Sequence, residues 1–331
     1  MKTRVFRWYV FLSSAVVWFS VALASSGAVP AQWNPRGPGG GGALFAPGFN
    51  PHSPDELYVN CDMSELFVTK SLGRSWETID FRRIQGGNLE LCPVQFTSLP
   101  GTIYAINYAN DSRTPFRSVD AGQTWSALAT DPTGGGAYCL YADPANTNRL
   151  IISDYNNIFF SSDGGASFST AFTVSDCHVA GAFFDGSRIF IGTIAGLVAS
   201  TNNGASFGLA AVTGIPAGEY MVTFAGAREG STVRFFCVTS SMVWPGINAY
   251  SDHYGYRGIY RLDYGVSPAW AAVTNGIVAG DHPWFASMCR TNISIAYVAG
   301  ARTDQPFPVV YKTINAGTSW QRCLRVDNND N

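Results

Sequence analysis

Short apolar runs recur along the chain and are separated by turn-forming residues. Residues 137–172 read AYCLYAD, PANTN, RLIISD, YN, NIFFSS, DGGA and SFSTAF, and residues 179–210 repeat this order as VAGAFFD, GS, RIFIGT, IAG, LVAS, TNNGA and SFGLA. Short runs rich in β-branched and aromatic residues, bounded by Gly, Pro, Asn and Asp, are typical of strands. Each repeat therefore predicts four antiparallel strands.

An eight-residue motif, called the octet below, follows the third predicted strand of each unit. Two full copies and three near copies occur, as SVDAGQTW at 118–125, SSDGGASF at 161–168, TKSLGRSW at 69–76, STNNGASF at 200–207 and TINAGTSW at 313–320. A degenerate unit with GIYRLDYGVSPAW at 258–270 fills the long gap before the last copy. Four-stranded units repeated about every 40 residues predict an all-β chain folded as a β-propeller.

Six blade units are visible in the sequence. Whether they close the ring by themselves or a seventh blade is needed stays open. The units are expected at 43–82, 92–130, 136–174, 178–213, 219–274 and 283–326.

The octet predicts the hairpin turn between the third and fourth strands of a blade. Its Asp or Asn side chain can accept hydrogen bonds from turn amides, its Gly permits a positive φ, and its aromatic residue fills the gap between blades. Repetition assigns these residues to structure and not to catalysis. They are Asp120, Gly122, Trp125, Asp163, Gly165, Phe168, Asn202, Asn315 and Trp320.

The octet consensus, SxDxGx[ST][WF], resembles the Asp-box or BNR repeat of sialidases, sortilin-type receptors and several glycoside hydrolases. This resemblance implies a propeller fold over most of the chain. It leaves the function open, because the repeat is shared by enzymes and by binding proteins.

Charge and cysteine content narrow the function classes. The chain has 21 basic and 23 acidic residues and no basic stripe, so we expect no nucleic-acid partner. The seven cysteines contain no CxxC pair, and the four histidines have no cysteine at ligand spacing, so we expect neither a metal nor a cofactor. Most of the cysteines are expected to be small buried hydrophobes, with one or two bridges left open.

The N-terminus predicts a secreted protein, either extracellular or periplasmic. MKTRVFR is basic, WYVFLSSAVVWFSV is apolar, and Ala22-Leu23-Ala24 is a small-x-small site, so residues 1–24 are read as a cleaved signal peptide. An uncleaved anchor helix is the alternative. After cleavage no membrane association is expected, and a Gly/Pro-rich segment, residues 25–42, precedes the propeller at 43–331.

Blade topology places the expected function on the face opposite the octets. That face carries the turns between second and third strands and the connections between blades. Asp62 and Asp154 occupy equivalent positions in two of these turns, where the fourth unit has Thr193. They are candidate catalytic carboxylates, and the alternative is that each satisfies the amides of its own turn.

The fifth unit has the largest insertion on the same face, at 240–258. It is rich in aromatic and titratable side chains suited to stacking on sugar rings or to acid–base chemistry, and a self-packed loop is the alternative. With the blade connections, the candidate substrate-binding residues are Trp244, Tyr250, Asp252, His253, Tyr254, Tyr256, Arg257, His178, His282 and Trp284.

The first unit, GPGGGGALFAPGFNPHSPDELYVNCDMSELFVTKSLGRSW, resembles the opening of the xyloglucan-active enzymes of glycoside hydrolase family 74. The resemblance implies that Asp62 is one of two catalytic carboxylates. Here Met63, Ser64 and Glu65 follow it, where the family has a Gly-rich pair. The family also places its second carboxylate in a second propeller, so the chain is either a partial member lacking a C-terminal propeller or a protein of different chemistry.

Three functions follow as hypotheses, each with a polysaccharide or oligosaccharide ligand. The favoured one is a xyloglucanase- or endoglucanase-like hydrolase in which Asp62 is the base and the acid is Asp154 or lies in the fifth-unit insertion. A non-catalytic propeller that binds carbohydrate or protein is the alternative. A polysaccharide lyase that uses His253 or Tyr254 as base and Arg257 to neutralise a uronate is the third.

Overall fold

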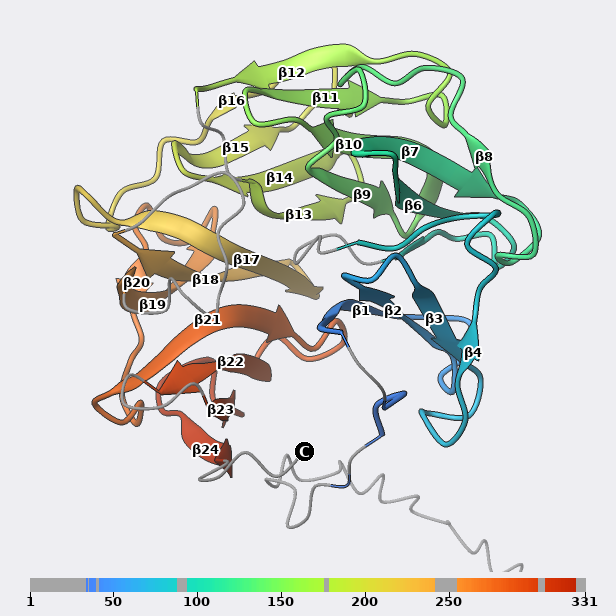
Figure 1. The fold of residues 1–331 in the computed structure, drawn as a ribbon. Helices are drawn as coiled ribbons and strands as arrows, with labels where there is room; N and C mark the ends of the chain where they lie inside the picture. The colour runs from blue at the N-terminus through green and yellow to red at the C-terminus, as the bar shows by residue number, and fades with distance from the viewer. Residues whose placement is uncertain are drawn as a thin grey trace, which may run out of the picture.

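The computed structural model describes residues 34, 36–39, 42–87, 94–175, 179–241, 255–302 and 307–325. Within these ranges 24 strands and no α-helix form six four-stranded antiparallel sheets arranged as the blades of a propeller (Figure 1). The predicted all-β propeller of six visible blades is therefore confirmed. No helix in the described ranges is long and apolar enough to cross a membrane. The predicted signal peptide lies outside them.

The strands run outward from the ring centre in chain order within each blade. Blades 1 and 2 contain β1 (Leu44–Phe49), β2 (Leu57–Cys61), β3 (Leu66–Thr69), β4 (Glu77–Thr78), β5 (Gln95–Phe96), β6 (Ile103–Ala109), β7 (Ser112–Ser118) and β8 (Ser126–Ala127). Blades 3 and 4 contain β9 (Cys139–Asp143), β10 (Asn146–Ser153), β11 (Asn157–Ser161), β12 (Ser169–Thr173), β13 (Val179–Asp185), β14 (Arg188–Thr193), β15 (Gly196–Ser200) and β16 (Gly208–Leu209). Blades 5 and 6 contain β17 (Tyr220–Glu229), β18 (Thr232–Ser240), β19 (Tyr256–Tyr264), β20 (Ala271–Ala272), β21 (Asp281–Met288), β22 (Ala296–Arg302), β23 (Pro308–Thr313) and β24 (Gln321–Arg325).

This antiparallel order gives the ring two faces. The octet face carries the turns between first and second strands and the octet turns between third and fourth strands, such as 118–125. The connection face carries the turns between second and third strands, such as 62–65 and 154–156, and the connections between blades. Asp62 and Asp154 thus lie on the face opposite the octets.

The octet turns are held by their own side chains. In blade 2 the Ser118 hydroxyl donates to Asp120 Oδ1 (2.7 Å) and accepts from the Gly122 amide (2.8 Å), and Asp120 accepts from both the amide and the hydroxyl of Thr124 (2.8 and 2.5 Å). The same contacts recur in blade 3 around Asp163. Asn replaces Asp in blades 4 and 6 and makes the equivalent bonds. The octet Gly has positive φ, as at Gly122 (φ 82°), because an L side chain is strained there.

The octet aromatic residues pack between neighbouring blades. Trp125 lies against the core shared by blades 1 and 2, Phe168 against that of blades 2 and 3, and Trp320 within that of blades 5 and 6. Two further cores join blade 3 to blade 4 and blade 4 to blade 5. The hydrophobic core of the propeller is therefore a series of layers between blades. Of the described cysteines, Cys61, Cys139 and Cys237 are buried and all five are free thiols.

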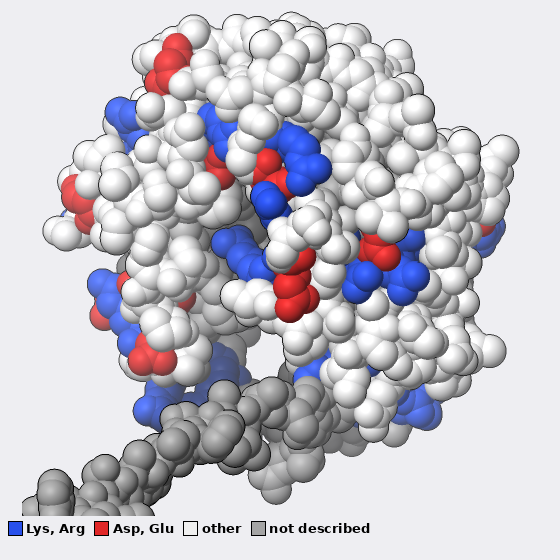
Figure 2. All heavy atoms as spheres, turned by 180° about the vertical axis from the view of Figure 1, so that it is seen from behind, with Lys and Arg blue, Asp and Glu red and all other residues white. Residues whose placement is uncertain are grey.

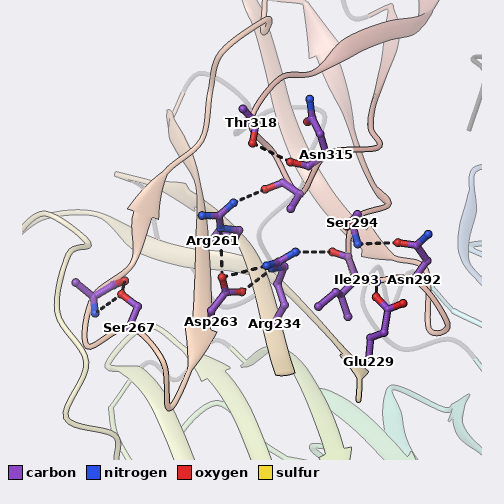
Figure 3. A network of polar contacts seen from close by, with 12 residues as sticks. Glu229, Arg234, Arg261, Asp263, Ser267, Asn292, Ile293, Ser294, Asn315 and Thr318 are labelled. Atoms are coloured by element: carbon purple, nitrogen blue, oxygen red, sulfur yellow. Dashed lines mark hydrogen bonds and ion pairs between the residues drawn. The ribbon is translucent and has the colours of Figure 1, made fainter. Parts of the chain in front are cut away.

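Arginine side chains tie neighbouring blades together at the octet face. Arg234 of blade 5 donates to Asp263 of the same blade (2.5 and 3.0 Å) and to the carbonyl oxygen of Ile293 in blade 6 (3.3 Å), as Figure 3 shows. Arg149 of blade 3, paired with Asp143, reaches into blade 4 in the same way. Arg149 and Arg234 therefore have a structural role.

A segment near the N-terminus completes the outer turn of blade 1. In blades 3, 5 and 6 this position is filled by the chain that leaves the preceding blade. In blade 6, for example, Trp320 Nε1 donates to the Val273 carbonyl oxygen (2.6 Å). In blade 1 Trp76 Nε1 donates instead to the carbonyl oxygen of Arg36 (2.7 Å), which also lies where a Cβ on Gly73 would be. In blade 1 the Arg36 carbonyl oxygen thus occupies the position that the exit chain of the preceding blade occupies in blades 3, 5 and 6.

We predict that the octet carboxylates make the propeller acid-sensitive. Hydrogen bonds from the Thr124 and Ser167 hydroxyls are the main cause that lowers the pKa of Asp120 and of Asp163 to about 2. A carboxyl group whose pKa is lowered in the fold contributes stability above its unfolded pKa, about 3.9, and that stability is lost as the pH falls through the folded pKa. The melting temperature should therefore drop between about pH 4 and pH 2.

Asparagine substitution tests this, because Asn202 and Asn315 already show that Asn fits the turn. The double variant Asp120→Asn, Asp163→Asn should lose less of its melting temperature over that pH interval than the wild type. Asp111→Asn, an exposed change outside any octet, should keep the wild-type slope. Equal slopes in the double variant and the wild type would contradict the prediction.

Removing the Trp76 indole N–H should release the N-terminal segment. A hydrogen bond of this kind contributes about 1 kcal/mol, so Trp76→Phe should raise the rate of tryptic cleavage after Arg36 by roughly fivefold. Trp125→Phe is the matched control, because Trp125 Nε1 donates within its own turn to Gly122 (3.1 Å). Equal cleavage rates in the two variants would show that Trp76 does not hold the segment.

Candidate functional site

Asp62 lies on the connection face directly after β2, with its side chain exposed. Its Oδ1 accepts a hydrogen bond from the Ala43 amide (2.8 Å), and its own amide donates to the Ala43 carbonyl oxygen (3.2 Å). Gly42 permits this approach, because a Cβ there would lie 2.9 Å from Asp62 Oδ1. The chain entering the first blade therefore fixes the carboxylate and leaves it open to solvent.

Asp154 occupies the equivalent turn of blade 3 but is used by that turn. Its Oδ1 accepts the amides of Asn156 (2.7 Å) and Asn157 (2.6 Å), and the Asn157 side-chain amide lies 3.3 Å from Oδ2. These contacts correspond to the structural alternative considered for this residue. Asp154 caps the hairpin between β10 and β11.

A pocket between blades 4 and 5 brings a carboxylate to the connection face. It has a volume of about 190 Å³, and its wall includes the turn after β14, the connection 212–215 and Glu219. Leu197, Met221 and Trp270 supply apolar surface. The lining also includes Thr193 and Thr213, so one charged group lies among both polar and apolar walls.

Two hydroxyl groups orient the Glu219 carboxylate. Its Oε2 accepts hydrogen bonds from Thr239 Oγ1 (2.7 Å), at the end of β18, and from the Tyr260 hydroxyl (3.0 Å), in β19. Burial raises the pKa of Tyr260 to about 12, and the hydrogen bond and negative charge of Glu219 add to the effect. The phenol therefore stays protonated at neutral pH and donates to the carboxylate.

A second group of aromatic and acidic side chains lies between blades 5 and 6. The Tyr256 and His282 rings lie 5.4 Å apart, tilted by 33°. Burial is the main cause that raises the pKa of Tyr256, with smaller contributions from Tyr260, Tyr311 and Glu219. Asp281 accepts hydrogen bonds from the Tyr311 hydroxyl and from Arg322 Nη1 (3.1 Å). The Asp281 carboxylate is therefore bound by side chains of its own blade.

The structure brings together only part of the expected substrate-binding set. Tyr256 and His282 are neighbours between blades 5 and 6, and Arg257 is exposed at the start of β19. Trp284 corrects the expectation of a surface residue, because it is 2% exposed within the core between blades 5 and 6 and its ring is not open to a sugar. The other predicted residues, His178, Trp244, Tyr250, Asp252, His253 and Tyr254, lie outside the described residues.

Sequence reasoning missed Glu219. The residue lies in the connection between blades 4 and 5, which belongs to the predicted functional face, and this placement was a usable signal. Its partners Thr239 and Tyr260 come from strands far along the chain, so the hydrogen-bonded carboxylate appears only in the fold. Among the described residues no cluster of three or more His, Cys, Asp or Glu side chains could hold a metal ion.

Solved propellers of several kinds are similar in structure to this chain. The GH74 xyloglucanase from Xanthomonas campestris matches 88% of this chain at 16% identity with a TM-score of 0.65, and a GH74 enzyme from Niastella koreensis matches 87% at 14% identity with a TM-score of 0.64. The matches cover 47% and 46% of those enzymes, so this chain spans about half their length.

Propellers of other kinds match at lower TM-scores. YCF48 bound to D1 peptide shares 12% identity over 85% of this chain and 82% of its own, with a TM-score of 0.55, and the RRP9 WD40 repeats share 9% over 87% and 81%, with a TM-score of 0.59. No protein-family model and no curated protein matches the sequence. At these identities the similarity establishes the propeller fold and leaves the activity open.

Replacing Glu219 by Gln should lower the pKa of Tyr260. The substitution removes a negative charge beside the phenol and keeps the shape of the side chain. Burial, the largest cause of the shift, remains, so the new pKa should lie between the ordinary value of about 10 and the present value of about 12. The measurement is the phenolate absorbance titration, with Tyr260 isolated by subtracting the Tyr260→Phe titration in each background.

Glu229→Gln is the matched control, since Glu229 ends β17 at the octet face. Its Tyr260 titration should equal that of the wild type. A Tyr260 titration unchanged by Glu219→Gln would contradict the coupling between the carboxylate and the phenol.

Proposed function

We propose that this chain recognises a polysaccharide on its connection face, as a secreted glycan-binding propeller. The observation that carries the proposal is the pocket in which the Thr239 and Tyr260 hydroxyls orient the Glu219 carboxylate. A carboxylate held in this way accepts hydrogen bonds from vicinal sugar hydroxyls, and charged acceptors make stronger bonds than neutral ones. The Tyr256 and His282 rings, which lie 5.4 Å apart between blades 5 and 6 on the same face, are candidates to stack on a further sugar ring of the polymer.

The N-terminal sequence supports the secreted location, because its basic and apolar regions followed by a small-x-small site have the pattern of a signal peptide. A polysaccharide is a ligand that a secreted propeller would meet. The chain is similar in fold to GH74 propellers, one of which is a xyloglucanase, and this similarity supports the choice of a polysaccharide as ligand.

Hydrolysis of the bound polysaccharide is the second candidate function, and Asp62 is the observation that favours it. Its carboxylate is exposed on the connection face and has one backbone donor, which suits a general base. Glycoside hydrolysis needs a second carboxyl group, about 5 Å away in retaining and about 6.5–9.5 Å in inverting enzymes. Asp154, the predicted partner, is used by its own turn, so we place binding ahead of hydrolysis.

Affinity electrophoresis against a panel of neutral plant and algal polysaccharides tests the binding function. At least one polymer should retard the wild-type protein. Glu219→Gln should weaken that retention by about tenfold, because it removes a charge-assisted hydrogen bond, whereas Glu229→Gln on the octet face should not. No retardation by any polymer, or equal retention of the two variants, would contradict the proposal.

The same panel separates binding from cleavage. New reducing ends that disappear in Asp62→Asn, with retention unchanged, would establish hydrolysis with Asp62 as a catalytic residue. Unsaturated products that absorb in the ultraviolet would indicate a lyase. Retention without either product would leave the binding function alone.

A further inference from the structure

A second cavity, called the channel cavity below, lies among the innermost strands at the ring centre. It has a volume of about 410 Å³ and is lined by the last residues of β9, β13, β17 and β21, the innermost strands of blades 3 to 6. Because these residues directly precede the turns between first and second strands, the cavity lies at the octet face. It is therefore separate from the Glu219 pocket, and an inference about it is independent of the proposed function.

The lining of this channel cavity has a net positive charge. It includes two guanidinium groups, of Arg228 and Arg290, and one carboxylate, of Asp185. Figure 2 shows one face of the molecule, on which Lys and Arg side chains lie around a central hollow with Asp and Glu side chains beside several of them. An anion entering the channel cavity would meet an excess of positive charge.

The single carboxylate of the lining is already neutralised. Asp185 Oδ1 accepts from Arg228 Nη1 (2.8 Å), and its Oδ2 accepts from Arg188 Nε (2.9 Å). Arg228 also donates through Nε to the Gly230 carbonyl oxygen (2.8 Å). Arg228 is thus held in place at the edge of the cavity, with its side chain half exposed.

Arg290 is the lining cation without such a role. It lies in the turn after β21, its side chain is exposed, and among the described residues it forms no ion pair. Arg149 and Arg234, by contrast, are bound to Asp residues and to carbonyl oxygens of neighbouring blades. An arginine that neither pairs nor ties blades together presents its full set of donors to a ligand.

The remaining lining suits a hydroxylated ring. Gln95 and Ser287 offer amide and hydroxyl groups, and Tyr141 and Phe183 offer ring surface. We propose that the channel cavity binds a sugar acid, a uronate, whose planar carboxylate pairs with Arg290 while its hydroxyls bond to the polar lining. The guanidinium fork matches a carboxylate in a bidentate manner, which distinguishes this ligand from a neutral sugar.

Calorimetric titration of the secreted protein with galacturonate tests the proposal. Galacturonate should bind, and glucose and inorganic phosphate should bind at least about tenfold more weakly, since the first lacks the carboxylate and the second lacks the ring. Arg290→Gln should weaken galacturonate binding by about tenfold or more. Arg74→Gln, which removes an exposed arginine from the blade 1 octet turn, should bind like the wild type.

Three results would overturn the inference. The first is no binding of galacturonate at millimolar concentration, and the second is equal affinity of Arg290→Gln and Arg74→Gln for galacturonate. The third is phosphate binding as tight as galacturonate binding, which would indicate a general anion site. Because Glu219→Gln alters only the connection face, it should leave galacturonate binding unchanged. Loss of binding in that variant would place the sugar acid at the Glu219 pocket instead.

Discussion

The propeller depends on the hydrogen bonds that close each octet turn. The fourth strand is only two residues long in blades 1, 2, 4 and 5, so the sheet ladder alone gives it few bonds. The octet hydroxyl and its Asp or Asn partner satisfy the turn amides that would otherwise lack acceptors. Blade 5 has no octet, and the turn before its outer strand is held by a bridge between Ala269 and Thr213 of the blade 4 exit segment.

Because all the octet turns lie on one face, the side chains of the two faces have different roles. The octet face carries the turn networks and the arginine ties between blades, which leaves Arg290 as a charged group of the channel cavity without a structural pair among the described residues. The connection face carries turns whose side chains are less constrained. There the fold exposes the Asp62 carboxylate and places Glu219 at the wall of a pocket. This division is the reason why we propose polysaccharide recognition on the connection face.

Repetition made the fold predictable, whereas the site depends on contacts that repetition does not encode. The octets identified the blade turns, and topology then placed Asp62 and Asp154 on the connection face. Their different environments could not be read from the chain, because the Ala43 amide reaches Asp62 from the entering segment while Asn156 and Asn157 lie beside Asp154. Trp284 was misplaced because it was grouped with the blade connection, whereas it lies inside β21 and its indole packs in the core between blades 5 and 6.

Hydrogen–deuterium exchange with and without a neutral polysaccharide that binds tests the central claim most directly. That claim is that the octets lock the fold and recognition takes place on the opposite face. The account predicts slower exchange on binding in 193–197, 213–221 and 256–260, with the octet turns 118–125 and 161–168 unchanged. Protection confined to the octet turns, with the connection face unaffected, would contradict it.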